Sequence, residues 1–251
     1  MQVPVTMSLR ARAAAAARHV ELLFFPSFCR LCSRPLGRPG ERIVCRDCLG
    51  RLAPRRGPVC LCCGRFFEGA GEDHLCARCL ERPPDFSVHR SCGRYDGVLK
   101  DLILLFKYRK YSVLGRALAA YAGESLGADD VLWQGADFLV PVPLHGKRKR
   151  ERGFNQSEVL TRELARIKGM NVLKGGLVKT ANVPPQTTLE SAGREKNVRG
   201  AYAVRGSSKI EGKTLVLVDD VFTTGSTLRE CSRVLRQAGA AEVRALTLAQ
   251  A

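Results

Sequence analysis

The sequence predicts a two-part protein: a small cysteine-rich region followed by an α/β domain with a parallel sheet flanked by helices. Eight cysteines within residues 29–79 form four Cys-x-x-Cys pairs. From about residue 95 onward, segments typical of strands alternate with segments typical of helices, which is the pattern of an α/β sheet. The expected divisions are a basic leader at 1–20, the cysteine-rich region at 21–84 and the α/β domain at 90–251.

The composition is that of a folded and strongly basic protein. Hydrophobic residues make up 45% of the 251 residues, enough for a core, and the formal net charge is +17. This charge favours polyanionic partners such as a phosphate-rich ligand or single-stranded nucleic acid, although a generally basic proteome explains it as well. No apolar run is long enough to cross a bilayer. We therefore expect a cytoplasmic protein in which clustered cysteines bind metal instead of forming disulfides.

The cysteine-rich region contains an internal repeat. Its first unit has two Cys-x-x-Cys pairs separated by twelve residues, and a shift of 31 residues reproduces this arrangement in the second unit. Arg34 maps onto Arg65 under the same shift, which indicates that a small unit has been duplicated. The paired cysteines are Cys29, Cys32, Cys45 and Cys48 in the first unit and Cys60, Cys63, Cys76 and Cys79 in the second.

Each cysteine unit can supply the four sulfur ligands of one closed tetrahedral zinc site. Units of about 30 residues bury too little apolar surface to fold alone, so metal binding would supply most of their folding free energy. Four sulfur ligands leave no position for water or substrate, which favours structural zinc over catalytic zinc. Buried free thiols or reversible disulfides are the alternative. Cys62 could replace Cys63 as a ligand, but the register of the repeat favours Cys63.

The elements of the α/β domain follow from the spacing of apolar residues. Val98, Leu102 and Phe106 recur at helical intervals and predict a helix. The strongest predicted strand runs from Thr214 to Val218, because this apolar run ends abruptly in two aspartates. The other expected elements are strands at 138–142, 172–178, 201–204 and 243–248, and helices from about 156 and at 226–237.

The segment from Val216 to Thr227 indicates a binding site, because a strand is followed by two adjacent acids and a hydroxyl-rich glycine turn that opens a helix. Backbone N–H groups at such a turn, with Thr and Ser hydroxyls, bind a phosphate dianion. Carboxylates at the carboxyl end of a strand accept hydrogen bonds from a vicinal diol and lie within reach of a magnesium ion. A phosphate beside a diol describes a ribose 5-phosphate. A capped helix without a ligand is the alternative.

This segment resembles the phosphoribosyl pyrophosphate signature of the type I phosphoribosyltransferases. With the cysteine repeat in front of it, the chain resembles the ComF family of competence proteins. The resemblance implies binding of phosphoribosyl pyrophosphate with magnesium, and it implies that Asp219 and Asp220 are the catalytic acids that hold the ribose hydroxyls. The residues expected at this ligand are Val218, Asp219, Asp220, Val221, Thr223, Thr224, Gly225, Ser226 and Thr227.

The stretch from Val140 to Gln156 resembles the pyrophosphate-side loop of the same family. Five of the six residues at 147–152 are cationic and would offset the charge of a leaving pyrophosphate. A solvated basic face is the alternative. The residues expected on this side are Pro143, Arg148, Arg152, Asn155 and Gln156.

Two further stretches resemble parts of the family's site. Lys107, Tyr108 and Arg109 resemble a motif on the substrate side. Residues 184–187 and 194–199 resemble a flexible loop that closes over the ligand.

The implied reaction is displacement of pyrophosphate from the ribose by a nitrogen nucleophile, which requires positioning and magnesium but no protein nucleophile. The sequence leaves open whether the chain turns over and which acceptor it would use. In the alternative, the chain is a catalytically silent accessory of DNA uptake. Its zinc ribbons and basic surface would then bind single-stranded DNA or a competence helicase.

Overall fold

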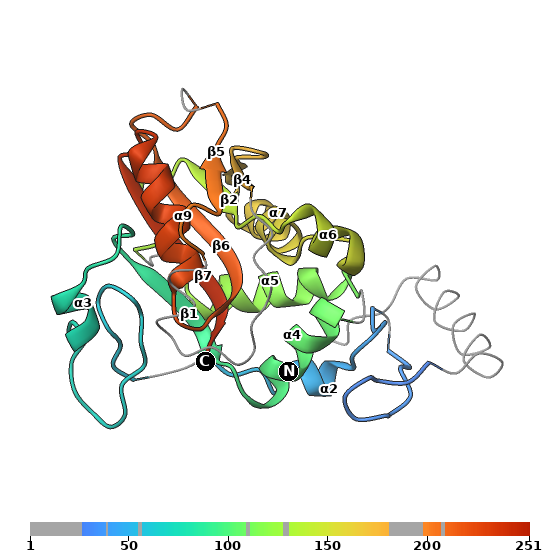
Figure 1. The fold of residues 1–251 in the computed structure, drawn as a ribbon. Helices are drawn as coiled ribbons and strands as arrows, with labels where there is room; N and C mark the ends of the chain where they lie inside the picture. Colours follow the sequence, from blue (N-terminus) through green and yellow to red (C-terminus); the bar gives the residue numbers. More distant parts are fainter. Residues whose placement is uncertain are drawn as a thin grey trace. The chain divides into compact units, whose positions relative to one another are not determined.

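The computed structural model describes residues 27–38, 40–54, 57–108, 111–127, 131–180, 198–206 and 209–251 (Figure 1). The chain forms two compact units, with the boundary between Leu52 and Ala53. The first cysteine repeat lies in one unit, and the second lies in the same unit as the sheet. No described helix is long and apolar enough to cross a membrane.

The sheet has five parallel strands in the order β1-β7-β6-β2-β3. The central strand β6 pairs with β7 on one side and with β2 on the other, and its residues Leu215 to Val218 are all 0% exposed. A strand buried on both faces needs apolar side chains at every position, which is why this run showed so clearly in the sequence. The strands are β1 His89–Arg94, β2 Phe138–Pro141, β3 Asn171–Val172, β6 Thr214–Phe222 and β7 Glu242–Gln250.

Helices cover both faces of the sheet because the crossover connections run in two directions. The connections from β1 to β2 and from β2 to β3 step toward one edge, while the connection from β6 to β7 steps back toward the other. Right-handed crossovers therefore place α9 on the face opposite α5 and α7 (Figure 1). The order reverses between β2 and β6, and ligands of open α/β sheets bind at such a switch point. These helices are α4 Gly97–Tyr108, α5 Leu114–Ser125, α7 Gln156–Lys168 and α9 Ser226–Gln237.

Three parts of this domain differ from the sequence prediction. The strand expected at 172–178 is wrong as one element, because a bend at Gly175 and Gly176 separates β3 from β4, Leu177–Lys179. Strand β4 instead pairs antiparallel with β5, Tyr202–Val204, outside the main sheet. The basic run forms a short helix, α6 Gly146–Arg152, and the sequence did not reveal β1 or α5.

The two cysteine units repeat each other in backbone detail. The bridge between Phe28 and Pro35 recurs 31 residues later between Val59 and Phe66. In each unit a short helix begins at the residue after the first cysteine of the second Cys-x-x-Cys pair. These helices are α2 Arg46–Leu49 and α3 Ala77–Glu81. The structure thus confirms the repeat predicted from the cysteine spacing.

Candidate functional site

Each cysteine unit brings its four sulfur atoms together. In both units these Sγ atoms lie within 4.8 Å of one another. A tetrahedral ion with Zn–S bonds of about 2.3 Å holds its sulfurs about 3.8 Å apart. Both groups therefore fit structural zinc. Three Sγ pairs show the match, at 3.9, 3.6 and 3.7 Å for Cys29–Cys48, Cys32–Cys45 and Cys63–Cys76 respectively.

The second unit also shows how the thiols are prepared for a cation. The amides of Cys63 and Cys76 each donate to the Cys60 sulfur over 3.4 Å. Burial favours the neutral thiol, but these bonds outweigh it and lower the pKa of Cys60 to about 7. Burial and neighbouring sulfurs raise the pKa of Cys79 to about 12. A divalent cation removes the cost of ionising crowded thiols, so the site is suited to bind one.

Cys62 lies outside the second sulfur cluster. Its thiol donates to the carbonyl of Phe86 over 3.8 Å, and Cys63 completes the group of four. The register of the repeat therefore indicated the correct cysteine.

The acidic pair Asp219 and Asp220 lies near the carboxyl end of β6, at the switch point of the sheet. Lys107, from α4, reaches this pair: its Nζ is 2.7 Å from Oδ1 of Asp220, and the two side chains are only 15% and 12% exposed. Ser157, in the first turn of α7, donates its hydroxyl to Oδ1 of Asp219 over 2.9 Å. Two helices distant in sequence thus fix the orientation of both carboxylates.

The electrostatics of the pair favour a bound cation. Burial and the adjacent Asp220 carboxylate raise the pKa of Asp219 to about 7. Burial alone would lower the pKa of Lys107, but Asp220 raises it, so this lysine stays charged. One lysine thus balances one of two adjacent acids. A magnesium ion would neutralise the second, since carboxylate oxygens are its preferred protein ligands.

The turn between β6 and α9 has the geometry of an anion-binding loop. Gly225, the residue before α9, has φ +78°, and a side chain there would clash with the Phe222 ring. The amide of Ser226, the first residue of α9, donates to the Thr224 hydroxyl over 3.4 Å. The other N–H groups in the first turn of an α-helix have no intrahelical partner, and such groups bind anions. The hydroxyls of Thr224 and Ser226 lie 2.7 Å apart at the same turn.

The pyrophosphate-side residues gather around the start of α7. Asn155 caps this helix by accepting from the Ser157 amide over 3.1 Å, and it donates to the carbonyl of Val142 over 3.0 Å. Arg152 donates to Oε1 of Gln156, and the buried Nε2 of Gln156 has no hydrogen-bond partner among the described residues. The loop after β2 is therefore tied directly to the helix that holds Asp219.

Side chains from the β4–β5 hairpin add to the site and were not foreseen. Burial, then nearby Arg148, lower the pKa of Lys179, while Asp219 acts in the opposite direction. The Nζ of Lys179 lies 5.1 Å from the ring centre of Tyr202. Ser157 was also missed, because a serine in the first turn of a helix is ordinary and only the fold brings it to Asp219.

The remaining predicted residues are less well connected to this centre. Tyr108 is 66% exposed and lies under the guanidinium of Arg152. Arg109 and residues 184–187 and 194–197 lie outside the described residues.

Comparison with known proteins agrees with both halves of the structure. Residues 138–251 match the model of the phosphoribosyl transferase domain family, and residues 20–94 match that of the double zinc ribbon domain family. Among solved structures, the glutamine phosphoribosylpyrophosphate amidotransferase from B. subtilis is 26% identical over 56% of this chain, with a TM-score of 0.34. The chain spans about a quarter of that enzyme, 26% of its length.

Curated relatives match over nearly the whole chain. The DNA utilization protein YhgH of Escherichia coli K12 is 32% identical over 230 residues, which are 88% of this chain and 96% of that protein. Competence protein F of Haemophilus influenzae is 28% identical over 83% of this chain and 90% of its own length. Competence protein ComFC of Bacillus subtilis is 28% identical over 84% of this chain and 85% of its own. With its two four-cysteine sites and its phosphoribosyltransferase-like sheet, this chain belongs to the ComF family.

Proposed function

We propose that the chain binds phosphoribosyl pyrophosphate with magnesium at the switch point and serves DNA uptake in natural competence. The observation that carries the ligand proposal is the arrangement along β6 and α9. Two oriented carboxylates, Asp219 and Asp220, precede the start of α9 by only a few residues. In this proposal the acidic pair binds the ribose diol, and the turn that follows it binds the 5-phosphate of the same ligand. The names of the relatives support the competence role.

In this proposal each part of the site has a separate task. The turn from Thr223 to Thr227 binds the 5-phosphate, and the acidic pair binds the ribose hydroxyls and magnesium. Lys107 and Ser157 are positioning residues, since they act through the carboxylates they hold. Arg148 and Arg152 lie on the side where the pyrophosphate would leave. Catalysis would consist of positioning and stabilisation of the leaving group, with no covalent intermediate on the protein.

Ligand-induced stabilisation tests the binding proposal. At a ligand concentration of 100 Kd the zinc-loaded chain should gain about 2.7 kcal/mol, which corresponds to roughly 5–10 °C in Tm for a chain of this size. Asp219→Asn should abolish this gain, because an amide binds the diol and magnesium poorly but keeps the oxygen that accepts from Ser157. No gain in the wild-type chain would refute the proposal.

A matched control lies at the opposite end of the same strand. Asp137 accepts from the amide of Thr214, the first residue of β6, over 2.8 Å, and it is far from the carboxyl edge. Asp137→Asn makes the same charge change and should leave the ligand gain intact. If both variants lose the gain equally, the effect is one of fold stability and the assignment to Asp219 is wrong. Turnover is measured separately, as pyrophosphate release with a panel of nitrogen acceptors.

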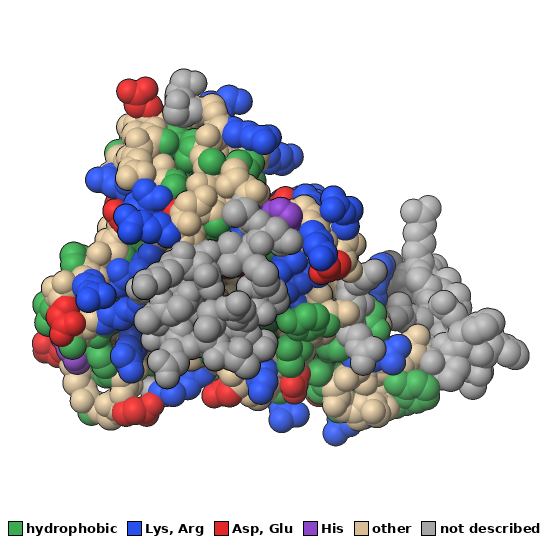
Figure 2. Space-filling model, in the orientation of Figure 1, with side chains coloured by type: hydrophobic (Ala, Val, Ile, Leu, Met, Phe, Trp, Pro, Cys, Tyr) green, Lys and Arg blue, Asp and Glu red, His purple; other side chains and the backbone are tan. Residues whose placement is uncertain are grey.

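A second candidate function, binding of single-stranded DNA by a silent accessory, is favoured by the basic surface. Lys and Arg side chains are numerous on the face shown in Figure 2, and Lys147, Lys149 and Arg150 of α6 are exposed. Binding of an oligothymidylate should weaken steeply between about 50 and about 200 mM salt, because phosphate contacts release counterions. Salt-independent binding, or none, would count against this function.

A further inference from the structure

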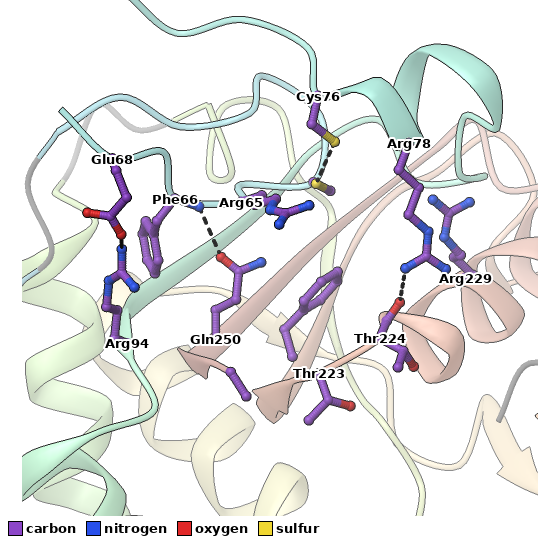
Figure 3. A pocket seen from close by; sticks show the side chains of 13 residues that line it. Arg65, Phe66, Glu68, Cys76, Arg78, Arg94, Thr223, Thr224, Arg229 and Gln250 are labelled. Atoms are coloured by element: carbon purple, nitrogen blue, oxygen red, sulfur yellow. Dashed lines mark hydrogen bonds and ion pairs between the residues drawn. The ribbon is translucent and has the colours of Figure 1, made fainter. Parts of the chain in front are cut away.

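A cavity of about 480 Å³ lies between the second zinc ribbon and the carboxyl ends of β6 and β7 (Figure 3). The ribbon contributes Arg65, Phe66 and Arg78, and the sheet contributes Phe222 and Gln250. Its volume lies within the usual range for small-molecule sites. The cavity borders the anion-binding turn through Thr223 and Thr224, but the acidic pair does not line it.

The lining of the cavity is strongly cationic. Apart from Cys63 and Cys76, which belong to the second sulfur group, the charged side chains that line it among the described residues are four arginines and one glutamate, a formal excess of three positive charges. Glu68 forms an ion pair with one of the four, Arg94. Gathering like charges around one cavity is unfavourable unless an anion offsets them, and guanidinium groups match phosphate oxygens in geometry. The charge therefore favours a ligand that carries phosphate.

Two of these arginines are held in place across the junction. Arg78 of the ribbon donates from Nη1 to the carbonyl of Thr224 over 3.0 Å, and Arg229 of α9 donates to the carbonyl of Arg82 over 3.0 Å. In Figure 3 both guanidinium groups lie on the same side of the cavity, above Thr224. Because their positions are fixed in advance, little side-chain entropy is lost when they bind an anion.

The same cavity offers aromatic surface. The rings of Phe66 and Phe222 both line it. The Phe222 ring is held by stacking on His89, with ring centres 4.3 Å apart. Aromatic rings beside arginines are the combination that binds a base together with its phosphate.

We propose that this cavity binds a nucleotide through its base and 5′-phosphate, as a site separate from the switch point. The proposal does not depend on phosphoribosyl pyrophosphate binding. The nucleotide is either a free mononucleotide or one unit of a single strand, and both present the same chemistry to the cavity. The arginines bind the phosphate, and the phenylalanine rings pack against the base.

The repeat provides a matched pair of variants. Arg65 is exposed and lines the cavity, while Arg34 is its equivalent in the first ribbon, 31 residues earlier. Affinity of the full zinc-loaded chain is measured by calorimetry for thymidine 5′-monophosphate and for an oligothymidylate of about ten nucleotides. Arg65→Gln should weaken binding roughly tenfold, since a charge-assisted hydrogen bond to phosphate is lost, and Arg34→Gln should not. Zinc content shows whether each variant retains its fold.

The outcomes separate the sources and the two sites. Binding of the mononucleotide that falls in Arg65→Gln alone supports the proposal with a free nucleotide. If only the oligothymidylate binds, and Arg65→Gln weakens it more than Arg34→Gln, the ligand is part of a single strand. Equal effects of the two variants, or no binding of either probe, overturn the proposal. If Asp219→Asn loses binding of the probe and Arg65→Gln does not, the probe binds at the switch point. That result also overturns the cavity proposal, and it leaves the proposed function standing.

Discussion

The two zinc ribbons share one cysteine spacing and one local backbone but have different surroundings. Cys29 and Cys60 accept the same type of amide bond, and the bridges beside them align after a shift of 31 residues. Yet the first ribbon packs in its own compact unit, while the second packs in the unit that contains the sheet. The metal-binding part of a duplicated unit can thus stay constant while the residues around it pack against a different part of the chain.

His89, the first residue of β1, is one point of attachment between the second ribbon and the sheet. The His89 amide donates to the carbonyl of Cys62 over 2.7 Å, and its Nδ1 lies 2.8 Å from the carbonyl of Cys63. Its Nε2 lies 3.0 Å from the hydroxyl of Thr247 in β7. This side chain therefore connects the zinc ligand loop to β7, the strand next to β1. If this attachment distinguishes the two ribbons, matched substitutions in them should have unequal effects on the sheet.

Removing one zinc ligand from each ribbon should give the largest difference. Cys29→Ser and Cys60→Ser should each lower the zinc content from two ions to one. Structural zinc supplies about 10 kcal/mol or more to the folding of such units. Only Cys60→Ser should transmit a loss of several kcal/mol to the sheet, because its ribbon packs in the sheet's core. Thermal unfolding monitored with zinc content measures both effects.

The comparison fails if the two variants destabilise the sheet equally. That result would mean that both ribbons contribute to one cooperative unit, in spite of the division at Leu52. Chelation of both ions should reproduce the Cys60→Ser loss in the wild-type chain, and in Cys29→Ser it should still cause a further loss.

Protonation of His89 should weaken the attachment of the second ribbon in acid. Burial in the core lowers the pKa of His89 from 6.5 to about 4. As the pH falls, this histidine therefore takes up its proton in the unfolded chain before it does so in the folded chain. The neutral His89 side chain contributes its full stabilisation above pH 6.5, and this stabilisation is lost as the pH falls through 4. The loss over this range is about 3 kcal/mol, since each pKa unit is worth about 1.4 kcal/mol.

The measurement compares the pH dependence of the free energy of unfolding in variant and wild-type chains. His89→Asn should be less stable at neutral pH but should show a shallower loss in acid, and His74→Gln, at an exposed histidine in the same unit, should follow the wild type. Protonation of zinc ligands is common to all three chains and cancels in the difference. Parallel curves for His89→Asn and the wild type would show that this histidine is not the group that titrates.

A glycine at the contact between ribbon and sheet should give the next effect. Gly64 and its equivalent Ser33 both have positive φ, at +62° and +58°. A side chain at Gly64 would overlap the carbonyl oxygen of His89, whereas Ser33 already carries one. Gly64→Ala should therefore cost at least about 2 kcal/mol, from the strained backbone and the displaced strand. Ser33→Ala should cost less than about 1 kcal/mol, as surface changes do. Similar losses of Tm in both variants would contradict the close packing of the second ribbon.

The ribbons could be predicted from sequence because their information is local. Cysteine spacing fixes which sulfurs meet, and the repeat even distinguished Cys63 from Cys62. The central strand β6 and helix α9 were predictable for a related reason, since burial on both faces and the glycine turn at Gly225 are visible in consecutive residues. The phosphate site that the family resemblance implies after β6 stays a prediction.

The contacts that complete the candidate site were not visible, because they depend on long-range packing. Lys107 precedes its partner Asp220 by more than a hundred residues, and its motif suggested a ligand contact instead of an ion pair. Ser157 and Lys179 lie in segments whose local pattern is ordinary. Strand β1 was missed for a similar reason, because its polar side chains His89 and Ser91 form hydrogen bonds with Thr247 on the neighbouring strand. Only the order of strands explains why a buried strand tolerates them.

The smallest expected effect belongs to the hydrogen bond from Arg78 of the second ribbon to the turn between β6 and α9. Arg78→Ala removes the donor to the carbonyl of Thr224, and because Arg78 is exposed the loss of stability should stay below about 1 kcal/mol. The effect of Arg78→Ala on ligand binding should be larger than its effect on Tm, because the hydrogen bond that fixes the Thr224 carbonyl is lost. We therefore expect a weaker stabilisation by phosphoribosyl pyrophosphate in Arg78→Ala, while Arg30→Ala in the first ribbon keeps the full gain. Equal gains in both variants would mean that the hydrogen bond from Arg78 does not affect ligand binding at the turn between β6 and α9.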